Sequence, residues 1–467
     1  MLDEIFRQYD IRAKIGPELA VHEVYDLVRA IAYYFVQQNP LVKRVAVGAD
    51  GRIHSPAIKT EVCRALQDSG LDVIFVGMCP TPVLYFSLFT MPVQAGIMIT
   101  ASHNGKEYNG LKLCLGTESV WGTQIQEINR FYRRAIFRTE VCQGTYEEHF
   151  LIPRYVAWLK NNFPDLIGLK TSFIIDCGNG AAGTVLPLLI KEFGWPNCHL
   201  LYPEVDGTYP NHEADPTVPH NMEELKRIVM VGDMQFGIGL DGDCDRMSPM
   251  TKKGRLVTGD ALLALFAADV LKDNPQASIV FDIKCSSALA EVIIANGGIA
   301  RMAPSGHSII KSYMREHRAL LGGELSCHFF FNDHYFGYDD GIYSALRLIR
   351  LLKNSGKSLD ELLTIFPYRC TTPELRLACA AENQKNIIHI LKDFFWLYPQ
   401  AHISLLDGIR ITLPCGWLLV RGSNTQSVLC IRAEGQDKKS LVALWSILCS
   451  VLVPFFTHEQ MTLVCNE

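Results

Sequence analysis

The sequence predicts an α/β protein with three consecutive α/β domains of mixed, largely parallel sheets, followed by a smaller α+β domain. Two observations support this fold class. A strand–helix–strand pattern recurs three times, and about the last hundred residues change to short alternating segments. The length of 467 residues exceeds what one hydrophobic core usually holds. We place the domains at residues 1–148, 149–253, 254–366 and 367–467.

Each repeat consists of a short apolar strand that ends near an aspartate, then a helix, a glycine and a second strand. A helical crossover between two strands makes those strands parallel, so each repeat predicts one βαβ unit. The aspartates are Asp50, Asp176 and Asp282. The predicted strands are 44–48 and 71–76, 172–175 and 199–202, and 278–281 and 299–302, with helices 56–68, 184–193 and 287–295 between them.

The C-terminal part differs from the repeats. Segments 408–413, 417–420 and 428–432 alternate polar and apolar residues and are separated by turn-forming residues, which predicts antiparallel strands. A helix is predicted from about residue 438 to 453. These elements suggest an α+β domain.

Composition and charge exclude several classes of protein. The formal net charge is −5 and the pI about 6.3, so no overall positive field indicates nucleic-acid binding. The apolar run 441–456 is short and interrupted by Pro454, so we expect no membrane span. The N-terminus shows no secretory signal, and the 15 cysteines contain no CxxC pair. We therefore expect a cytoplasmic protein with reduced thiols.

The serine loop, residues 100–105, follows a predicted buried strand at 95–99. It places Ser102 at the open end of a strand, where α/β proteins often carry their chemistry. A serine in such a position can act as a nucleophile if a neighbouring group activates it. The alternative is an ordinary turn, because Ser, Asn and Gly are common turn residues.

The aspartate loop, residues 241–246, carries Asp241, Asp243 and Asp245 at alternate positions. Three carboxylates in one tight loop repel each other unless a cation lies among them, and oxygen ligands favour Mg²⁺ over zinc. An EF-hand is excluded, because its sixth and twelfth positions would be Arg246 and Lys252. An aspartyl-phosphate phosphatase and a solvated acidic turn are the alternatives. Arg246 adds a positive charge suited to a phosphate.

Two further loops contain residues suited to sugars and phosphates. The sugar loop, residues 322–328, carries Glu324, Ser326 and His328, of which two at alternate positions would share a face if the loop is extended. The phosphate loop, residues 421–425, reads RGSNT and supplies many hydrogen-bond donors for a dianion. A hairpin and a plain turn are the respective alternatives. The GNGAAG segment at 178–183 is interpreted as a βα turn rather than a dinucleotide site.

These four loops occur in this order, one in each predicted domain, and together they resemble the α-D-phosphohexomutase superfamily. The GGELSCH and RGSNT sequences are most similar to the bacterial phosphomannomutase/phosphoglucomutase group. The resemblance covers essentially the whole chain. It implies four domains round a central cleft, a serine that carries a phosphoryl group, one Mg²⁺ per chain, and a hexose 1,6-bisphosphate as activator.

The resemblance also implies roles for particular residues. Ser102 would be the catalytic residue, and its phosphorylated form would bind the metal together with Asp241, Asp243 and Asp245. His103 would shape the loop rather than act as a base. The residues implied to bind substrate are Tyr9, Arg12, Lys112, Arg246, Lys284, His307, Glu324, Ser326, His328, Arg421, Ser423, Asn424 and Thr425.

The sequence departs from the family pattern at a few loop positions. Gly105 and Lys106 stand where prolines are common, and Ala13, Cys244 and Cys327 replace glycines. Because glycine adopts positive φ freely, we expect the cysteines to alter loop geometry and rate more than the class of reaction.

The predicted function is interconversion of hexose 1-phosphates and hexose 6-phosphates, of mannose or glucose, through a hexose 1,6-bisphosphate. The enzyme is expected to be a monomer whose partner is a small phosphosugar. The alternatives are a phosphoglucosamine mutase, a phosphosugar-binding paralogue without turnover, and a phosphatase whose serine loop admits water.

Overall fold

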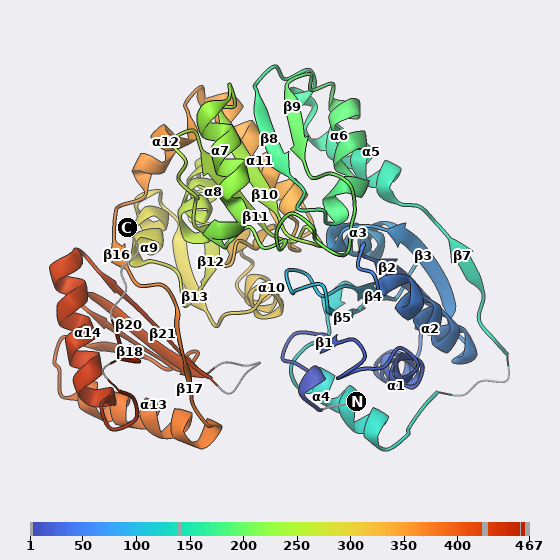
Figure 1. The fold of residues 1–467 in the computed structure, drawn as a ribbon, viewed down its shortest axis with the longest axis horizontal. Helices are drawn as coiled ribbons and strands as arrows, with labels where there is room; N and C mark the ends of the chain where they lie inside the picture. The colour runs from blue at the N-terminus through green and yellow to red at the C-terminus, as the bar shows by residue number, and fades with distance from the viewer. Residues whose placement is uncertain (1–2, 139–141, 423–427, 458, 463–467) are drawn as a thin grey trace. The chain divides into compact units, whose positions relative to one another are not determined.

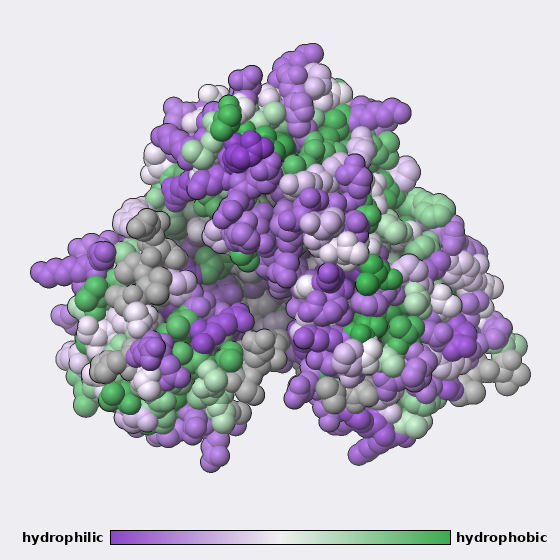
Figure 2. Space-filling model, viewed as in Figure 1, coloured by the Kyte–Doolittle hydropathy of each residue, from purple (hydrophilic) through white to green (hydrophobic). Residues whose placement is uncertain are grey.

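The computed structural model describes residues 3–138, 142–422, 428–457 and 459–462. The chain divides into two compact units: unit 1 comprises Met1–Gly259 and Ser326–Leu363, and unit 2 comprises Asp260–Leu325 and Thr364–Glu467. Figure 1 labels the helices and strands of both. Hydrophilic side chains predominate on the face shown in Figure 2, with hydrophobic ones scattered among them. No helix within the described ranges is long and apolar enough to cross a membrane.

The first sheet of unit 1 is mixed, with seven strands in the order β1-β5-β4-β2-β3-β7 and β6 paired to β5. Strands β2, β3, β4 and β7 are parallel, whereas β5 is antiparallel to β1 and β4. The strands are β1 (Ile11–Lys14), β2 (Arg44–Ala49), β3 (Asp72–Met78), β4 (Ala95–Ile99), β5 (Tyr108–Leu115), β6 (Glu118–Ser119) and β7 (Tyr146–Glu148).

Helices cover both faces of this sheet, as a largely parallel sheet requires. Helix α1 packs against α2 and α4, and apolar side chains of the three helices share one core with Val45 and Val47 of β2 (Figure 1). Helix α3 covers the other face, where a Cβ at Gly96 would meet Leu84 and Leu88. The four helices are α1 (Glu23–Gln38), α2 (Ser55–Asp68), α3 (Thr81–Thr90) and α4 (Thr123–Arg133), and the short 3₁₀ helix η1 is Asp3–Ile5.

The second sheet of unit 1 has the order β11-β10-β8-β9. Strand β8 is parallel to β9 and β10, and β11 is antiparallel to β10. Helix α11, which comes much later in the chain, contacts β10 and β11. The strands are β8 (Phe173–Asp176), β9 (Cys198–Leu201), β10 (Phe236–Leu240) and β11 (Met247–Thr251). The other elements are α5 (Ile152–Asn162), η2 (Pro164–Leu166), η3 (Ala181–Thr184), α6 (Leu186–Phe193), η4 (Pro219–Met222), α7 (Glu223–Val231), β15 (Phe329–Phe331), α11 (Gly341–Ser355) and α12 (Leu359–Leu362).

Unit 2 contains a parallel arrangement and an antiparallel sheet. Strand β12 is parallel to both β13 and β14. The C-terminal sheet runs β16-β21-β20-β19-β18, with β17 also paired to β21, and its described pairings are antiparallel. Helices α13 and α14 share a hydrophobic core with this sheet.

The elements of unit 2 are α8 (Gly259–Asp273), β12 (Ser278–Asp282), α9 (Ser287–Ala295), β13 (Ile299–Ala303), α10 (His307–Glu316), β14 (Leu321–Gly323), η5 (Leu363–Ile365), β16 (Cys370–Thr371), β17 (Leu375–Ala378), α13 (Ala381–Trp396), β18 (His402–Ser404), β19 (Ile409–Leu413), β20 (Gly416–Gly422), β21 (Val428–Gly435) and α14 (Lys438–Leu452).

The predicted fold class is confirmed. The strand expected at 95–99 coincides with β4 and the helix expected at 287–295 with α9. Each of the three predicted crossovers joins parallel strands: β2 with β3, β8 with β9, and β12 with β13. The sequence did not predict the antiparallel β5, the short strands β16 to β18 or helix α13. The three domain boundaries stay predictions.

Candidate active site

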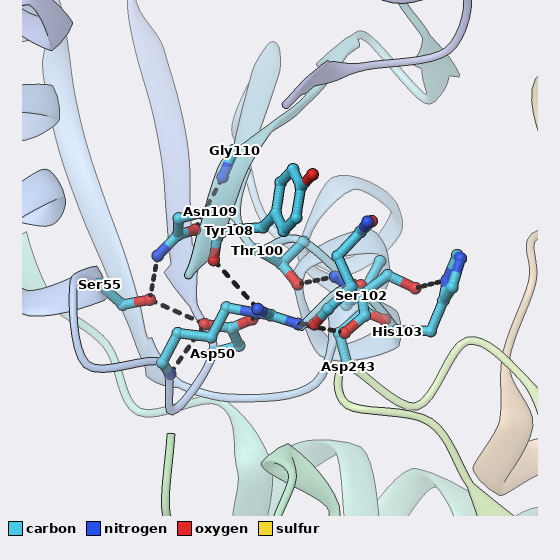
Figure 3. A network of polar contacts seen from close by, with 12 residues as sticks. Asp50, Ser55, Thr100, Ser102, His103, Tyr108, Asn109, Gly110 and Asp243 are labelled. Carbon is cyan, nitrogen blue, oxygen red and sulfur yellow. Dashed lines mark hydrogen bonds and ion pairs between the residues drawn. The ribbon is translucent and has the colours of Figure 1, made fainter. Parts of the chain in front are cut away.

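Ser102 lies at the carboxyl end of β4, buried against the aspartate loop. Its hydroxyl donates to Asp241 Oδ2 at 2.8 Å and lies 3.1 Å from His103 Nδ1. Its N–H donates to Thr100 Oγ1 at 2.9 Å, and Figure 3 shows both Thr100 and His103 in contact with it. The residue has φ +52°, in the left-handed region that non-glycine residues rarely adopt. The loop therefore holds this serine in a strained but defined position.

The aspartate loop follows β10 and brings three carboxylates together. Asp241, Asp243 and Asp245 are almost wholly buried, and one oxygen of each lies within 4.8 Å of the others. Lys112 of β5 places Nζ 2.7 Å from Asp243 Oδ2 and also contacts Asp245 Oδ2. Thr81, at the start of α3, donates from Oγ1 to Asp243 Oδ2 at 2.5 Å. The cluster is thus positioned by strand and helix ends of the first sheet.

Burial and mutual repulsion set the charge state of this cluster. Burial, followed by Asp245 and Asp243, raises the pKa of Asp241 well above its usual value. Burial also opposes ionisation of Asp245, but Lys112 and His328 outweigh it and hold the pKa of Asp245 well below its usual value. The cluster therefore has a strong attraction for added positive charge.

The donor set suits a hard divalent cation. All of the candidate ligand atoms are carboxylate oxygens, and Asp243 Oδ1 is buried with no hydrogen-bond partner among the described residues. An unpartnered buried carboxylate oxygen is costly unless a cation takes its lone pairs. The residues present thus fit a bound cation of the magnesium type.

Positive and imidazole groups surround the carboxylates. Arg246 donates its backbone N–H to Asp241 Oδ1 at 3.1 Å. His328 Nε2 lies 3.2 Å from both Asp245 Oδ1 and Arg246 Nε. Ser326 Oγ is 3.3 Å from His328 Nδ1. These predicted substrate residues are therefore brought together beside the aspartate loop.

The N-terminal residues approach the serine loop from β1. Arg12 is 9% exposed, and its guanidinium contacts Asn104 Oδ1 and pairs with Asp10, whose Oδ2 accepts from Nε at 3.0 Å. Tyr9 lies half-buried in the bend just before β1. Burial, then the charges of Arg246 and Arg12, lowers the pKa of His103 well below its usual value. The imidazole beside Ser102 is thus neutral at pH 7, and the expected loop-shaping role of His103 stays a prediction.

The remaining predicted residues lie in unit 2, where they form a second polar group. Lys284 Nζ is 3.5 Å from Asp282 Oδ2 at the end of β12, and Ser305 Oγ donates to the same oxygen at 2.9 Å. Glu324 Oε1 accepts from Gly306 N–H at 2.6 Å, directly before His307 begins α10. Arg421 Nε is 3.0 Å from Asp407 Oδ2. The predicted Ser423, Asn424 and Thr425 lie outside the described residues.

The structure corrects two expectations about the loops. Cys244 and Cys327 adopt φ +60° and +67°, so both cysteines retain the left-handed conformation that glycine would take. The expected loss of that conformation is wrong, because neighbouring contacts enforce it: Gly341 N–H donates to Cys244 O at 2.8 Å and Met247 N–H to Cys327 O at 3.2 Å. The sugar loop also turns at Cys327 instead of running extended, yet Ser326 and His328 still meet.

Sequence reasoning missed Arg52 and Thr81. Arg52 is 1% exposed and donates to several carbonyls of the serine loop. The sequence contains a signal for both residues, because Arg52 follows Asp50 at the end of β2 and Thr81 follows Pro80 after β3. Strands β2, β3 and β4 are parallel in one sheet, so their carboxyl ends lie at the same edge. The order of the strands, which brings these ends to Ser102, cannot be read from local pattern.

A serine hydroxyl held against a buried carboxylate cluster that fits a divalent cation is an arrangement suited to phosphoryl transfer. Family models of phosphoglucomutase/phosphomannomutase match the chain in four segments: alpha/beta/alpha domain I at 3–138, domain II at 153–254, domain III at 258–368, and the C-terminal domain at 377–444. The chain belongs to the phosphoglucomutase/phosphomannomutase family.

Individual relatives agree with this assignment. A phosphomannomutase/phosphoglucomutase of Pseudomonas aeruginosa is 38% identical over 442 residues, which cover 94% of this chain and 93% of that protein. A phosphoglucomutase of Neisseria meningitidis is 37% identical over 441 residues, 94% of each chain. A crystal structure of a family member from Burkholderia thailandensis has a TM-score of 0.89 at 33% identity and covers 97% of this chain and 98% of its own. The resemblance inferred from the four loops is confirmed.

Proposed function

We propose that this protein is a phosphohexomutase that interconverts the 1-phosphates and 6-phosphates of glucose and mannose through a phosphorylated Ser102. The observation that carries the proposal is the 2.8 Å hydrogen bond from Ser102 Oγ to Asp241 within the buried carboxylate cluster. The substrates follow the names of relatives that share more than a third of their sequence with this chain over nearly its whole length.

Phosphorylation of Ser102 would create a need for a cation. The hydroxyl proton that bridges Oγ and Asp241 would be lost, and a dianion would lie beside three carboxylates. Asp241, Asp243, Asp245 and an oxygen of the phosphoserine would then hold one Mg²⁺. When bound, this ion neutralises charge on the transferring phosphoryl group.

The proposed transfer proceeds in two balanced halves. The bond between Ser102 Oγ and phosphorus breaks as phosphorus bonds to a hydroxyl of the hexose monophosphate; the proton of that hydroxyl passes to a base of the site, and the leaving Oγ takes up a proton from an acid of the site. The product is a hexose 1,6-bisphosphate and unmodified Ser102. After the bisphosphate reverses its orientation, Ser102 accepts the other phosphoryl group and the isomeric monophosphate leaves. Added hexose 1,6-bisphosphate would act as activator by phosphorylating the serine.

Binding roles are proposed both for the residues beside the serine and aspartate loops of unit 1 and for the polar group of unit 2. Arg12, Lys112, Arg246 and His328 would receive the reacting phosphate, since they lie in the same unit as Ser102 and contact its loop or the carboxylates. Lys284, His307, Glu324 and Arg421, with Ser423, Asn424 and Thr425, would hold the sugar hydroxyls and the distal phosphate. One chain supplies each of these residues, so we propose a monomer, and the free thiols of the described cysteines support a cytoplasmic location.

The test is turnover of purified protein with glucose 1-phosphate and, separately, mannose 1-phosphate, in the presence of Mg²⁺ and a trace of glucose 1,6-bisphosphate. We expect both 6-phosphates to form. Ser102→Ala should reduce the rate by at least about 10³-fold, because it removes the group that carries the phosphoryl. Ser446→Ala, at an exposed position of α14, is the matched control.

Other products would support other functions. Release of inorganic phosphate without isomer would indicate a phosphatase, and binding without product a paralogue that lacks turnover. Efficient isomerisation of glucosamine 1-phosphate in preference to both hexoses would indicate a phosphoglucosamine mutase.

A further inference from the structure

Arg52 lies in the turn between β2 and α2, and its guanidinium donates hydrogen bonds to the serine loop. Its side chain is completely buried. One terminal nitrogen, Nη2, donates to Ser102 O and Asn104 O, each at 2.6 Å. The other, Nη1, donates to Gly105 O at 2.8 Å and to Tyr108 O at 3.0 Å. With Nε bonded to Asp50 Oδ2 at 3.2 Å, the five N–H groups of the guanidinium all have acceptors.

The guanidinium is itself held in place. Asp50 Oδ1 accepts from the backbone N–H of Arg52 at 3.1 Å and from Ser55 Oγ at 2.7 Å. Asn109 Nδ2 donates to Ser55 Oγ at 3.0 Å, and Figure 3 shows Ser55 between Asp50 and Asn109. The ring of Tyr209 lies over the guanidinium at 5.3 Å. The hydrogen bonds among Arg52, Asp50, Ser55 and Asn109 therefore join the end of β2, the start of α2 and the start of β5.

These contacts account for the unusual conformation of Ser102. A non-glycine residue at φ +52° is strained and persists when its surroundings over-determine it. Hydrogen bonds from a buried charged donor to the carbonyls of Ser102 and Asn104 fix the peptide planes that follow these two residues. None of these bonds involves the hydroxyl, so Oγ stays available to the carboxylates.

We propose that Arg52 is a positioning residue for phosphoryl transfer, which fixes the serine loop so that the phosphoryl group on Ser102 reaches a sugar hydroxyl and not water. This inference rests on the proposed function. The phosphoserine must survive until a sugar arrives, and a loop that shifts by even about 1 Å loses alignment with the acceptor. A lysine at this position keeps the charge but cannot reproduce the planar fork, since it has three donors at one nitrogen.

The experiment compares wild type, Arg52→Lys and the matched control Arg64→Lys, an exposed arginine on α2. Three quantities are measured with glucose 1-phosphate: kcat, KM, and the inorganic phosphate released per mutase turnover. For Arg52→Lys we expect kcat to fall about tenfold or more, KM to change less than threefold, and phosphate release per turnover to rise about tenfold. Arg64→Lys should match wild type in all three.

A purely structural role would lower the active fraction, so kcat and phosphate release would fall together. An unchanged ratio of phosphate release to turnover in folded Arg52→Lys would therefore overturn the inference while leaving the proposed function intact. Absence of mutase turnover in wild type would overturn both. If Arg52→Lys does not fold, Ser55→Ala decides the question: it loosens the Asp50 anchor and should raise the same ratio two- to fivefold, and an unchanged ratio contradicts the proposal.

Discussion

The serine loop and the aspartate loop face each other, and the protein stabilises them by opposite means. Each has one residue in the left-handed region, Ser102 at φ +52° and Cys244 at φ +60°. The serine loop presents carbonyl oxygens to a permanently buried cation, Arg52. The aspartate loop presents carboxylates to Lys112 and leaves one buried oxygen of Asp243 without a hydrogen bond among the described residues.

Hydrogen bonds to Arg52 thus hold the shape of the serine loop, whereas the negative charge of its carboxylates is the main feature of the aspartate loop. Under the two proposals, the buried guanidinium of Arg52 sets the position of Ser102, whereas the carboxylates would bind an ion that can exchange. Substitutions in the Arg52 hydrogen-bond network should therefore lower turnover by the same factor at every magnesium concentration. Substitutions in the aspartate loop should change how turnover depends on magnesium concentration.

The largest effect is expected for Asp243→Asn. This change removes the negative charge of a carboxylate that contacts Lys112 and Thr81 and whose second oxygen we assign to Mg²⁺. A bound metal supplies several kcal/mol of transition-state stabilisation, so kcat should fall about 10³-fold and the half-saturating Mg²⁺ concentration should rise. Both are read from turnover against Mg²⁺ concentration, with the exposed Asp233→Asn as control. A kcat within tenfold of wild type at every Mg²⁺ concentration would contradict the assignment.

Thr81→Val should have an intermediate effect. It removes the 2.5 Å hydrogen bond to Asp243 Oδ2 and nearly preserves side-chain shape. A hydrogen bond to a charged group contributes about 1.5–3 kcal/mol, so kcat/KM at limiting Mg²⁺ should fall about 10- to 100-fold and recover in part at high Mg²⁺. Thr60→Val, exposed on α2, provides the comparison. A loss of the same size at every Mg²⁺ concentration would assign Thr81 to the shape-setting group with Arg52.

The free energy of unfolding that Asp340 contributes next to the aspartate loop should depend on pH. It caps α11, whose first residue, Gly341, donates to Cys244 O. Burial raises the pKa of Asp340 to about 6, although Tyr335 and Tyr155 hydroxyls donate to it. A pKa raised on folding gives stability that is fully present below about pH 4 and lost as pH rises through 6, which amounts to about 3 kcal/mol.

Asp340→Asn has no carboxyl to titrate. The unfolding free energy of wild type minus that of Asp340→Asn should therefore fall by up to about 3 kcal/mol between pH 4 and pH 7. Urea unfolding of both proteins at several pH values measures this difference, and Asp233→Asn should show none. A difference that does not vary with pH would mean that Asp340 is ionised throughout.

The smallest effect is expected for Cys244→Gly. Because Cys244 already adopts φ +60°, glycine should keep the loop geometry, and kcat should change less than about threefold. Relief of about 1–2 kcal/mol of backbone strain is offset by the greater freedom of glycine in the unfolded chain and by the lost burial of the side chain. Steady-state rates and thermal unfolding test this, and a tenfold rise in kcat would show that the cysteine had displaced the carboxylates.

Local signals predicted the three crossover units and part of the C-terminal sheet. Apolar runs that end at an acidic residue predicted β2, β8 and β12, and glycines marked the ends of the crossover helices. The three aspartates were recognised as a site because crowded carboxylates require a partner, whatever the fold. The antiparallel β5 was missed because it follows the serine loop directly and belongs to none of the strand–helix–strand repeats, and its direction is set by pairing with β1 and β4.

The sequence could not predict which segments far apart in the chain lie in contact. Arg52 and Ser102 are fifty residues apart, and their contact depends on β2 lying next to β4 in the sheet. The conformation of Cys244 likewise depends on a helix nearly a hundred residues later, whose N-terminus bonds its carbonyl. Glycine-to-cysteine changes therefore looked disruptive from sequence, although tertiary contacts impose the same backbone.

The most direct test of the account follows the phosphoryl group itself. Protein is labelled on Ser102 with ³²P from glucose 1,6-bisphosphate, freed of excess reagent, mixed with glucose 6-phosphate and quenched at millisecond times. We predict that the label appears in hexose bisphosphate at least as fast as steady-state turnover, with little free phosphate, and that Ser102→Ala takes up no label. Label that leaves mainly as inorganic phosphate, or equal labelling of Ser102→Ala, would contradict the proposal that Ser102 carries the phosphoryl group between sugars.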